Sequence, residues 1–391
     1  MASFLLALIY ISFISLGLPD SLLGSSWPIM HAEISVPVSF AGIISAVMFI
    51  GTIISSLYSD RLLKRFGAGK VTAVSTAMTA VALFGFSISN SFWMLILWSI
   101  PYGLGAGAID AILNNYVALH YKAQHMSWLH CMWGVGASIS PYIMSFALIK
   151  LENWSFGYLI VAGIQIALSI VIFASIPAWK KNGEEAQTET SSAKALKFKE
   201  IFSIKGAIPC FLTFFGYCAL ELTTSLWASS YLVEKWEFSP EIAAGFASMF
   251  YIGITLGRFA NGFLAMKLSD HSLIRMGMAI IALGITLLLL PLSSTLALIG
   301  FIVVGLGCAP IFPCIIHMTP DVFGAGNSQA MIGVQMAFAY TGFLIMPPLF
   351  GVIAEQISIS LLPIFLLMLL LLMFVTHEIV IKKEKCNKNR I

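Results

Sequence analysis

Charge is scarce in this sequence. Asp, Glu, Lys and Arg make up 10% of its 391 residues, whereas 59% of the residues are hydrophobic. Soluble globular domains carry about a quarter charged residues, so the composition excludes one. Hydrophobic runs of roughly 20 residues recur from end to end, each long enough to cross a ~30 Å hydrocarbon layer. We therefore expect an all-α polytopic membrane protein that lies in a lipid bilayer and has no nucleic-acid partner.

Sequence motifs for catalysis and metal binding are also missing. The chain has no HExxH, no GxSxG and no Walker sequence, so nothing supports hydrolysis or ATP-driven pumping. Its six cysteines form no CxxC pair, and therefore indicate neither a zinc site nor a disulfide framework. We expect a protein that is not an enzyme and needs no cofactor and no metal.

Twelve hydrophobic stretches are long enough to be membrane spans. They lie near residues 4–30, 37–59, 71–89, 92–119, 126–149, 155–176, 206–232, 240–265, 273–291, 294–317, 327–353 and 358–381. The first has no charged start and no small-residue cleavage site, so it reads as a retained helix. A polar stretch separates six spans from six. The predicted domains are a six-helix bundle (1–177), a cytoplasmic linker (178–205), a second six-helix bundle (206–381) and a cytoplasmic tail (382–391).

The basic residues favour one orientation. With the N-terminus inside, most of them fall in the segments 61–70, 178–205 and 382–391, which then face the cytoplasm. Only Lys150 and Lys235 fall on the other side. Because cytoplasmic loops carry an excess of Lys and Arg, we expect both termini to be cytoplasmic. We also expect the protein to lie in the cell membrane as a monomer.

The two halves of the chain resemble each other. A Gly-Leu-Gly sequence begins at Gly103 and recurs at Gly305, 202 residues later, and Gly51 and Gly253 have the same offset. Small residues let helices pack closely, which is the plain interpretation of any one of these glycines. A shared offset at two places favours a duplicated six-helix unit, as in transporters that hold substrate between two repeats.

Three carboxylates fall deep inside predicted spans. Asp20 follows Pro19 in the first span, Asp110 lies in the fourth and Glu221 in the seventh. We expect no Lys or Arg at their depth. A buried acid is costly and tends to be functional, and low polarity favours its protonated form. All three are therefore candidates for proton coupling, or for binding another cation. The proline before Asp20 indicates a local break that frees backbone groups inside a polar cavity.

Polar and aromatic residues in the spans could contact a substrate. Asn114 lies one helical turn from Asp110, and a carboxylate beside an amide suits ligands rich in hydroxyl groups. His130 could relay protons, or could be a buried structural histidine. Tryptophans could stack on a sugar, or could simply pack or anchor the helices. The full set of candidate substrate contacts is Asp20, Trp27, Asn114, Asn115, His130, Trp133, Glu221, Trp227 and Gln335.

Several segments resemble those of one family. "YSDRLLKRFGAGK" (58–70) looks like the inner-loop signature of the major facilitator superfamily, in which acidic and basic residues latch an inner gate. The group most similar within it is that of the fucose, galactose and glucose proton symporters. The fourth span of that group reads roughly GLGxxETAxNP, and here Gly103-Leu104-Gly105, Asp110 and Asn114 match. "LGRFANGFL" (256–264) and "IFPCI" (311–315) match further segments, as do Tyr217, Glu221 and Trp227 of the seventh span.

The resemblance implies a fold of twelve helices in two bundles and proton-coupled uptake by alternating access. Asp110 would carry the proton, with Asp20 and Glu221 in the polar cavity. The residues that it implies for the inner gate are Asp60, Arg61, Arg65 and Arg258. The chain is then expected to move a small hydroxylated solute, such as a sugar, together with H⁺. Two alternatives stay open: efflux of cationic or amphipathic compounds in exchange for protons, and sodium-coupled sugar uptake.

Overall fold

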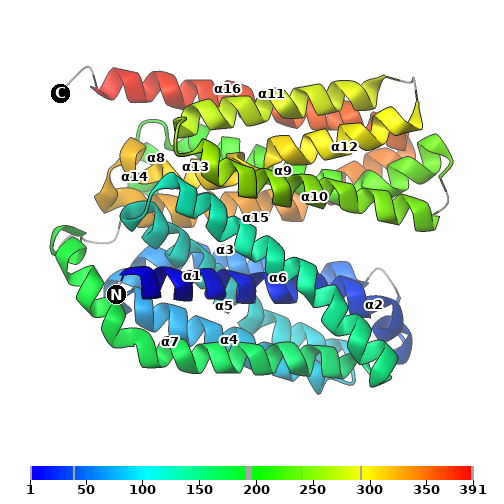
Figure 1. Cartoon of the computed structure of the whole chain (residues 1–391), viewed down its shortest axis with the longest axis horizontal. Coiled ribbons are helices and arrows are strands. Elements are labelled where there is room, and N and C mark those ends of the chain that lie inside the picture. The colour runs from blue at the N-terminus through cyan, green and yellow to red at the C-terminus, as the bar shows by residue number, and fades with distance from the viewer. Residues whose placement is uncertain (1, 38–39, 191–195, 239, 291–292, 389–391) are drawn as a thin grey trace. The chain divides into compact units, whose positions relative to one another are not determined.

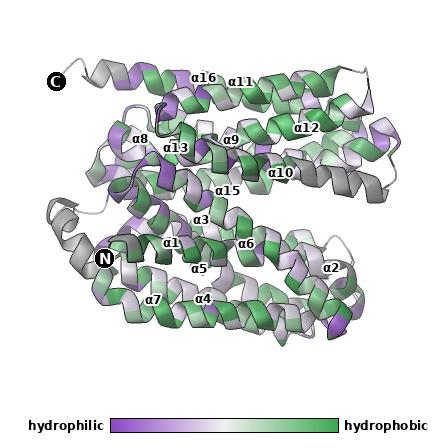
Figure 2. Cartoon of the chain, viewed as in Figure 1, coloured by the Kyte–Doolittle hydropathy of each residue, from purple (hydrophilic) through white to green (hydrophobic). Residues whose placement is uncertain are grey.

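The chain folds almost entirely into helices. The computed structural model describes residues 2–37, 40–190, 196–238, 240–290 and 293–388, with the side chains of 2–3, 28, 180–190, 240–249 and 385–388 left aside. Within these ranges no β-strand occurs (Figure 1). Eleven helical segments of the described residues are long and apolar enough to cross a membrane. Figure 2 shows that hydrophobic residues dominate these long helices.

The first half of the chain contains six hydrophobic helical segments. The first is broken into α1 (Ala2–Gly17), the 3₁₀ turn η1 (Leu18–Ser21) and α2 (Leu22–Glu33). The others are α3 (Phe40–Phe66), α4 (Ala68–Ser87), α5 (Phe92–His120), α6 (Ala123–Lys150) and α7 (Trp154–Thr190). Helix α7 continues into the stretch expected as a linker, of which residues 191–195 lie outside the described residues.

The second half begins with the short helix α8 (Phe198–Ser203). The longer helices that follow are α9 (Ala207–Trp236), α10 (Pro240–Leu264), α11 (Asp270–Leu289), α12 (Ser294–Cys308), α15 (Ala325–Gln356) and α16 (Leu362–Lys388). Between α12 and α15 lie α13 (Ile311–His317) and α14 (Thr319–Phe323), and the 3₁₀ turn η2 (Ile359–Leu361) precedes α16. The 25-residue helix α10 is a further long helix beside the eleven candidate spans.

The helices form two compact units that do not follow the halves of the sequence strictly. The first unit holds residues 1–116, 129–195 and 325–337, and the second holds 117–128, 196–324 and 338–391. In the first unit α4 packs along α7, and aromatic residues such as Phe86 and Tyr158, stacked 5.3 Å apart, fill the core. In the second unit α12 packs against both α10 and α11, and α16 against α9.

The repeat predicted from the glycines is present in the packing of the helices. A Cβ atom added to Gly103 would lie 2.2 Å from the carbonyl oxygen of Met48, so α3 and α5 touch through their backbones. A Cβ added to Gly305 would lie 2.3 Å from the carbonyl oxygen of Phe250, where α10 crosses α12. Met48 and Phe250 are themselves 202 residues apart, so the two crossings use equivalent positions.

Candidate functional site

The break in the first hydrophobic segment lies where the sequence predicts it. Helix α1 ends at Gly17, and Pro19 lies inside the 3₁₀ turn that joins it to α2. Proline ends a helix here because it has no N–H for the helical hydrogen bond and its ring clashes with the preceding turn. Asp20 follows immediately and is therefore carried by the turn rather than by a continuous helix.

Asp20 accepts hydrogen bonds from two aromatic side chains of the first unit. The Nε1 atom of Trp133 donates to its Oδ2 at 2.8 Å, and the hydroxyl of Tyr102 donates to its Oδ1 at 3.3 Å. Asp20 is solvent-exposed, Trp133 is half-buried and Tyr102 is buried. Residues of α5 and α6 thus hold the carboxylate, which stays accessible to a ligand. Sequence reasoning missed Tyr102, which carries no charge and lies in an apolar run.

Asp110 belongs to a buried chain of hydrogen bonds. The Nδ2 atom of Asn114 donates to its Oδ1 at 2.7 Å, which confirms that the two side chains share a helix face. The carbonyl Oδ1 of the same amide lies 3.0 Å from Nε2 of His130. Since the amide nitrogen already donates to Asp110, the amide oxygen is the acceptor and Nε2 of His130 is the donor. All three residues are buried, with Asp110 only 5% exposed.

Glu221 has a cationic partner, which corrects one expectation. The Nη2 atom of Arg258 lies 3.2 Å from its Oε1, and the guanidinium is almost fully buried. The expectation that no basic residue lies at the depth of Glu221 is therefore wrong. Arg258 precedes the end of α10 by six residues, or roughly 9 Å at 1.5 Å per residue. It lies within the helix, and the inner-gate role that the resemblance implies for it stays a prediction.

The tryptophans expected at a substrate site lie in different surroundings. Trp27 is buried in the hydrophobic core of the first unit. Trp227, in the second unit, donates its Nε1 hydrogen to the carbonyl oxygen of Pro347 at 3.0 Å and meets Phe350 edge-on. Trp133 donates its indole hydrogen to the candidate carboxylate of Asp20. This arrangement favours Trp133 over the other two for contact with a ligand.

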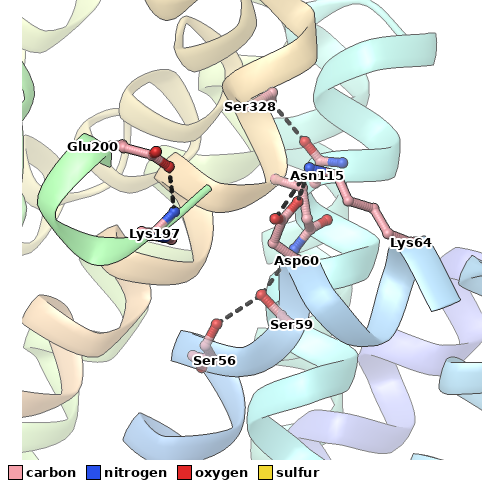
Figure 3. Close-up of polar contacts among 9 residues, drawn as sticks. Ser56, Ser59, Asp60, Lys64, Asn115, Lys197, Glu200 and Ser328 are labelled. Atoms are coloured by element: carbon pink, nitrogen blue, oxygen red, sulfur yellow. Dashed lines mark hydrogen bonds and ion pairs between the residues drawn. The ribbon is translucent and has the colours of Figure 1, made fainter. Parts of the chain in front are cut away.

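The first turns of α15 contact α3 and α5 within the first unit. The hydroxyl of Ser328 donates to Oδ1 of Asn115 at 2.6 Å (Figure 3), and Nε2 of Gln329 donates to the hydroxyl of Ser59 at 3.0 Å. A Cβ added to Gly333 would lie 2.5 Å from the carbonyl oxygen of Ser56. Asn115 thus holds α15, and is not free to face a substrate in this structure. Sequence reasoning missed Ser328 and Gln329, because a serine and a glutamine at a helix start are common.

Gln335, the candidate of the eleventh hydrophobic stretch, lies further along α15. Its side chain is fully buried within the first unit.

Three of the four charged residues expected at an inner gate, Asp60, Arg61 and Arg65, lie at the end of α3. Asp60 is buried and pairs with Lys64, whose Nζ lies 3.1 Å from its carboxylate (Figure 3). The guanidinium of Arg61 lies 5.2 Å from the ring centre of Tyr58, and that of Arg65 lies 5.3 Å from that of Phe66. Asp60 is therefore bound to its own helix, next to Ser59, which receives the bond from Gln329.

These features define a class of protein. Long apolar helices enclose polar residues that sit within the spans, and among the described residues no group of His, Cys, Asp or Glu is suited to hold a metal. Such an arrangement is typical of a secondary transporter.

Comparison with known proteins identifies the family. The sequence profile of the Major Facilitator Superfamily matches residues 9–247 and 210–385, and the chain belongs to this superfamily. It is therefore a multi-pass membrane protein and a transporter, not an enzyme.

Individual relatives are distant. Bypass of stop codon protein 6 of Saccharomyces cerevisiae is 24% identical over 90% of this chain and 78% of its own length. The glucose/mannose transporter GlcP of Bacillus subtilis is 21% identical over 78% of this chain and 77% of its own. The crystal structure of the E. coli fucose:proton symporter FucP (N162A) superposes with a TM-score of 0.78 at 14% identity, over 96% of this chain and 98% of that one. The similarity to FucP shows a shared fold, and confirms the two-bundle architecture.

Proposed function

We propose that the protein takes up a small neutral hydroxylated solute, such as a sugar, together with a proton. The observation that carries the proposal is the buried chain from Asp110 through Asn114 to His130. A buried carboxylate is costly when ionised and cheap when protonated. Binding and release of one proton at Asp110 can therefore decide whether the protein changes conformation.

The site around Asp20 supports a hydroxylated ligand. Its accessible carboxylate can accept hydrogen bonds from hydroxyl groups, and the half-buried indole of Trp133 offers an apolar surface beside it. Transported sugars combine both features, because their rings have apolar faces and a rim of hydroxyls. The relative GlcP carries glucose and mannose in its name, and the structure of similar fold is a fucose:proton symporter.

The ion pair of Glu221 with Arg258 argues for a neutral solute over a cation. Efflux of a cationic compound would draw on a carboxylate that is free to pair with it, and Glu221 is already paired with Arg258. In the sodium-coupled alternative, Na⁺ would bind at Asp110 and Asn114 in place of the proton, and the Na⁺ dependence of uptake separates the two. We propose that the protein lies in the cell membrane as a monomer. Both termini would then face the cytoplasm, because this orientation places the basic segments 61–70, 178–205 and 382–391 inside.

In the proposed cycle, solute and proton bind together on one side and leave together on the other. Solute binds at Asp20 and Trp133, and a proton neutralises Asp110. The neutral site permits the contacts between α15 and the ends of α3 and α5, such as Ser328 with Asn115, to open and re-form. Asp60, Arg61, Arg65 and Lys64 would stabilise the closed form of this gate from the end of α3.

The test uses purified protein in proteoliposomes. A thermal-shift screen of L-fucose, D-galactose, D-glucose, D-mannose and quaternary amines at two pH values first identifies a ligand, since a ligand stabilises the folded state by mass action. Uptake of that ligand is then driven by a pH gradient, with Na⁺ present or replaced by choline. Asp110→Asn should abolish pH-driven uptake yet retain exchange of labelled for unlabelled ligand. Asp110→Glu, which keeps the carboxylate, is the matched control.

These measurements distinguish proton-coupled uptake from sodium-coupled uptake and from cation efflux. Unchanged pH-driven uptake by Asp110→Asn would show that Asp110 does not carry the proton. Uptake that needs Na⁺ at constant pH would establish the sodium-coupled alternative. Stabilisation by amines but by none of the sugars would favour cation efflux.

A further inference from the structure

The break at Pro19 removes one backbone hydrogen-bond donor from the end of α1. In an α-helix the N–H of residue 19 would donate to the carbonyl oxygen of Ser15, four residues earlier, and proline has no N–H. Inside a membrane no bulk water reaches such a carbonyl, so neighbouring side chains must supply the hydrogen bond. Ser15 is buried, being 3% exposed.

Gln165 of α7 supplies that hydrogen bond. Its Nε2 donates to the carbonyl oxygen of Ser15 at 2.5 Å, and its Oε1 accepts from the hydroxyl of the same serine at 2.7 Å. Both hydrogen bonds join residues 150 positions apart in the sequence. The glutamine therefore binds the last turn of α1 at two atoms, and its donor is placed where the proline N–H is missing.

The opposite side of the break is held against α6. A Cβ added to Gly17 would lie 2.1 Å from the carbonyl oxygen of Trp133, so the two backbones are in direct contact. The hydroxyl of Ser21 donates to the carbonyl oxygen of Ala137 at 2.7 Å. With α7 on one side and α6 on the other, the turn that carries Asp20 is fixed between two helices.

A small cavity lies between Gln165 and Tyr102, a hydrogen-bond donor to Asp20. Its volume of about 10 Å³ is near the size of a single water molecule. Gln165, Ser15 and Pro19 line it together with Tyr102, whose hydroxyl donates to Asp20. Gln165 thus lies beside both the backbone of Ser15 and the side chain of Tyr102, which donates a hydrogen bond to Asp20.

We propose that Gln165 is a positioning residue for Asp20. Its side-chain amide takes the place of the N–H that Pro19 lacks, and so holds the turn at the angle at which Asp20 meets Trp133. The consequence for transport rests on the function proposed above, whereas the positioning itself does not.

The test follows the Asp20–Trp133 hydrogen bond directly. The full chain is labelled with 5-fluorotryptophan in detergent, and the ¹⁹F resonance of Trp133 is assigned by its absence in Trp133→Phe. Asp20→Ala gives the shift expected when the carboxylate acceptor is lost. Gln165→Met, which has similar length but no polar atoms, should move the Trp133 resonance by at least half of that shift.

Two comparisons separate positioning from a general loss of packing. Ser169→Ala removes another buried hydrogen bond of α7, to the carbonyl oxygen of Ala73, and should leave the resonance in place. Pro19→Ala restores the missing N–H, so Gln165→Met should cause a smaller shift in the Pro19→Ala background. If Gln165→Met does not fold, Gln165→Asn serves, because its shorter amide cannot keep both bonds to Ser15.

The outcomes are distinct. An unmoved Trp133 resonance in Gln165→Met, or an equal shift in the two Pro19 backgrounds, would overturn the proposal. A shifted resonance in a protein that transports none of the sugars would leave Gln165 as the positioning residue and contradict the proposed function instead.

Discussion

Arg258 lies with its Nη2 atom 3.2 Å from Oε1 of Glu221, and both residues are in the second unit. The guanidinium is buried and the carboxylate nearly so. A buried pair of this kind contributes little compared with well-packed apolar residues, but removal of one partner leaves an uncompensated charge. Each residue is therefore required chiefly because the other is present.

The first prediction tests that dependence. Glu221→Gln and Arg258→Met should each destabilise the protein by about 3–5 kcal/mol, and the double variant should lose less than the sum. The measurement is the apparent Tm in detergent. Arg275→Met is the control, because its pair with Glu378 is half-exposed and worth roughly 0–1 kcal/mol. Strictly additive losses would show that the two charges do not depend on each other.

The second prediction concerns the indole of Trp133. Trp133→Phe keeps an aromatic ring but removes the hydrogen bond that positions Asp20. Since a hydrogen bond to a charged group contributes about 1.5–3 kcal/mol, the ligand should bind about 10- to 150-fold more weakly. We expect a raised KM and an unchanged pH dependence of uptake. Trp227→Phe, which loses a bond to a backbone carbonyl instead, should leave KM within about twofold. A changed pH dependence in Trp133→Phe would tie Trp133 to the proton rather than to the solute.

The third prediction concerns the contact between α5 and α15. The side chains of Ser328 and Asn115 meet at 2.6 Å, so cysteines at both positions should be joined by a short, reducible bis-methanethiosulfonate cross-linker. If the contact opens in each cycle, the cross-link should abolish uptake, and a reducing agent should restore it. The single variants Asn115→Cys and Ser328→Cys control for the loss of the native hydrogen bond. Full uptake by a completely cross-linked sample would show that this contact stays closed during transport.

The fourth prediction uses the two equivalent helix crossings. Gly103→Ala and Gly305→Ala each place a Cβ against a backbone carbonyl, which cannot retreat without moving its helix. Each should cost about 1–3 kcal/mol, as overpacked sites do, and lower the apparent Tm by similar amounts. Gly163→Ala is the control, since nothing lies within 4 Å of its added Cβ and alanine favours the helix. A loss at only one of the two glycines would mean that the crossings are not equivalent in strength.

Local relationships in this chain were predictable from the sequence, and those between distant residues mostly were not. The break at Pro19 and the pairing of Asp110 with Asn114 follow from the backbone of a single segment. The partnership of Glu221 with Arg258 depends on how α9 and α10 face each other, which hydrophobic runs do not reveal. The glycine offset is the exception, because repeated crossings leave a repeated small residue at a fixed interval.

Tyr102 and Gln165 show why the rest of the site was missed. Both are uncharged residues in apolar helices, so neither has the high cost of burying a charge in a membrane that marks a functional residue in a sequence. Their importance arises only from what lies opposite: the carboxylate of Asp20 for one, and the carbonyl of Ser15 for the other. A single sequence contains no record of these neighbours.

The contact of Ser328 with Asn115 also sets an order in the synthesis of the protein. The two residues are 213 positions apart, so a ribosome that adds about 5–20 residues per second needs roughly 10–40 s to reach Ser328 after Asn115 is made. The crossing of α3 with α5, by contrast, can form as soon as Gly103 has left the ribosome. During biogenesis the amide of Asn115 must therefore be accommodated by the insertion machinery, by lipid headgroups or by water until the eleventh hydrophobic stretch arrives.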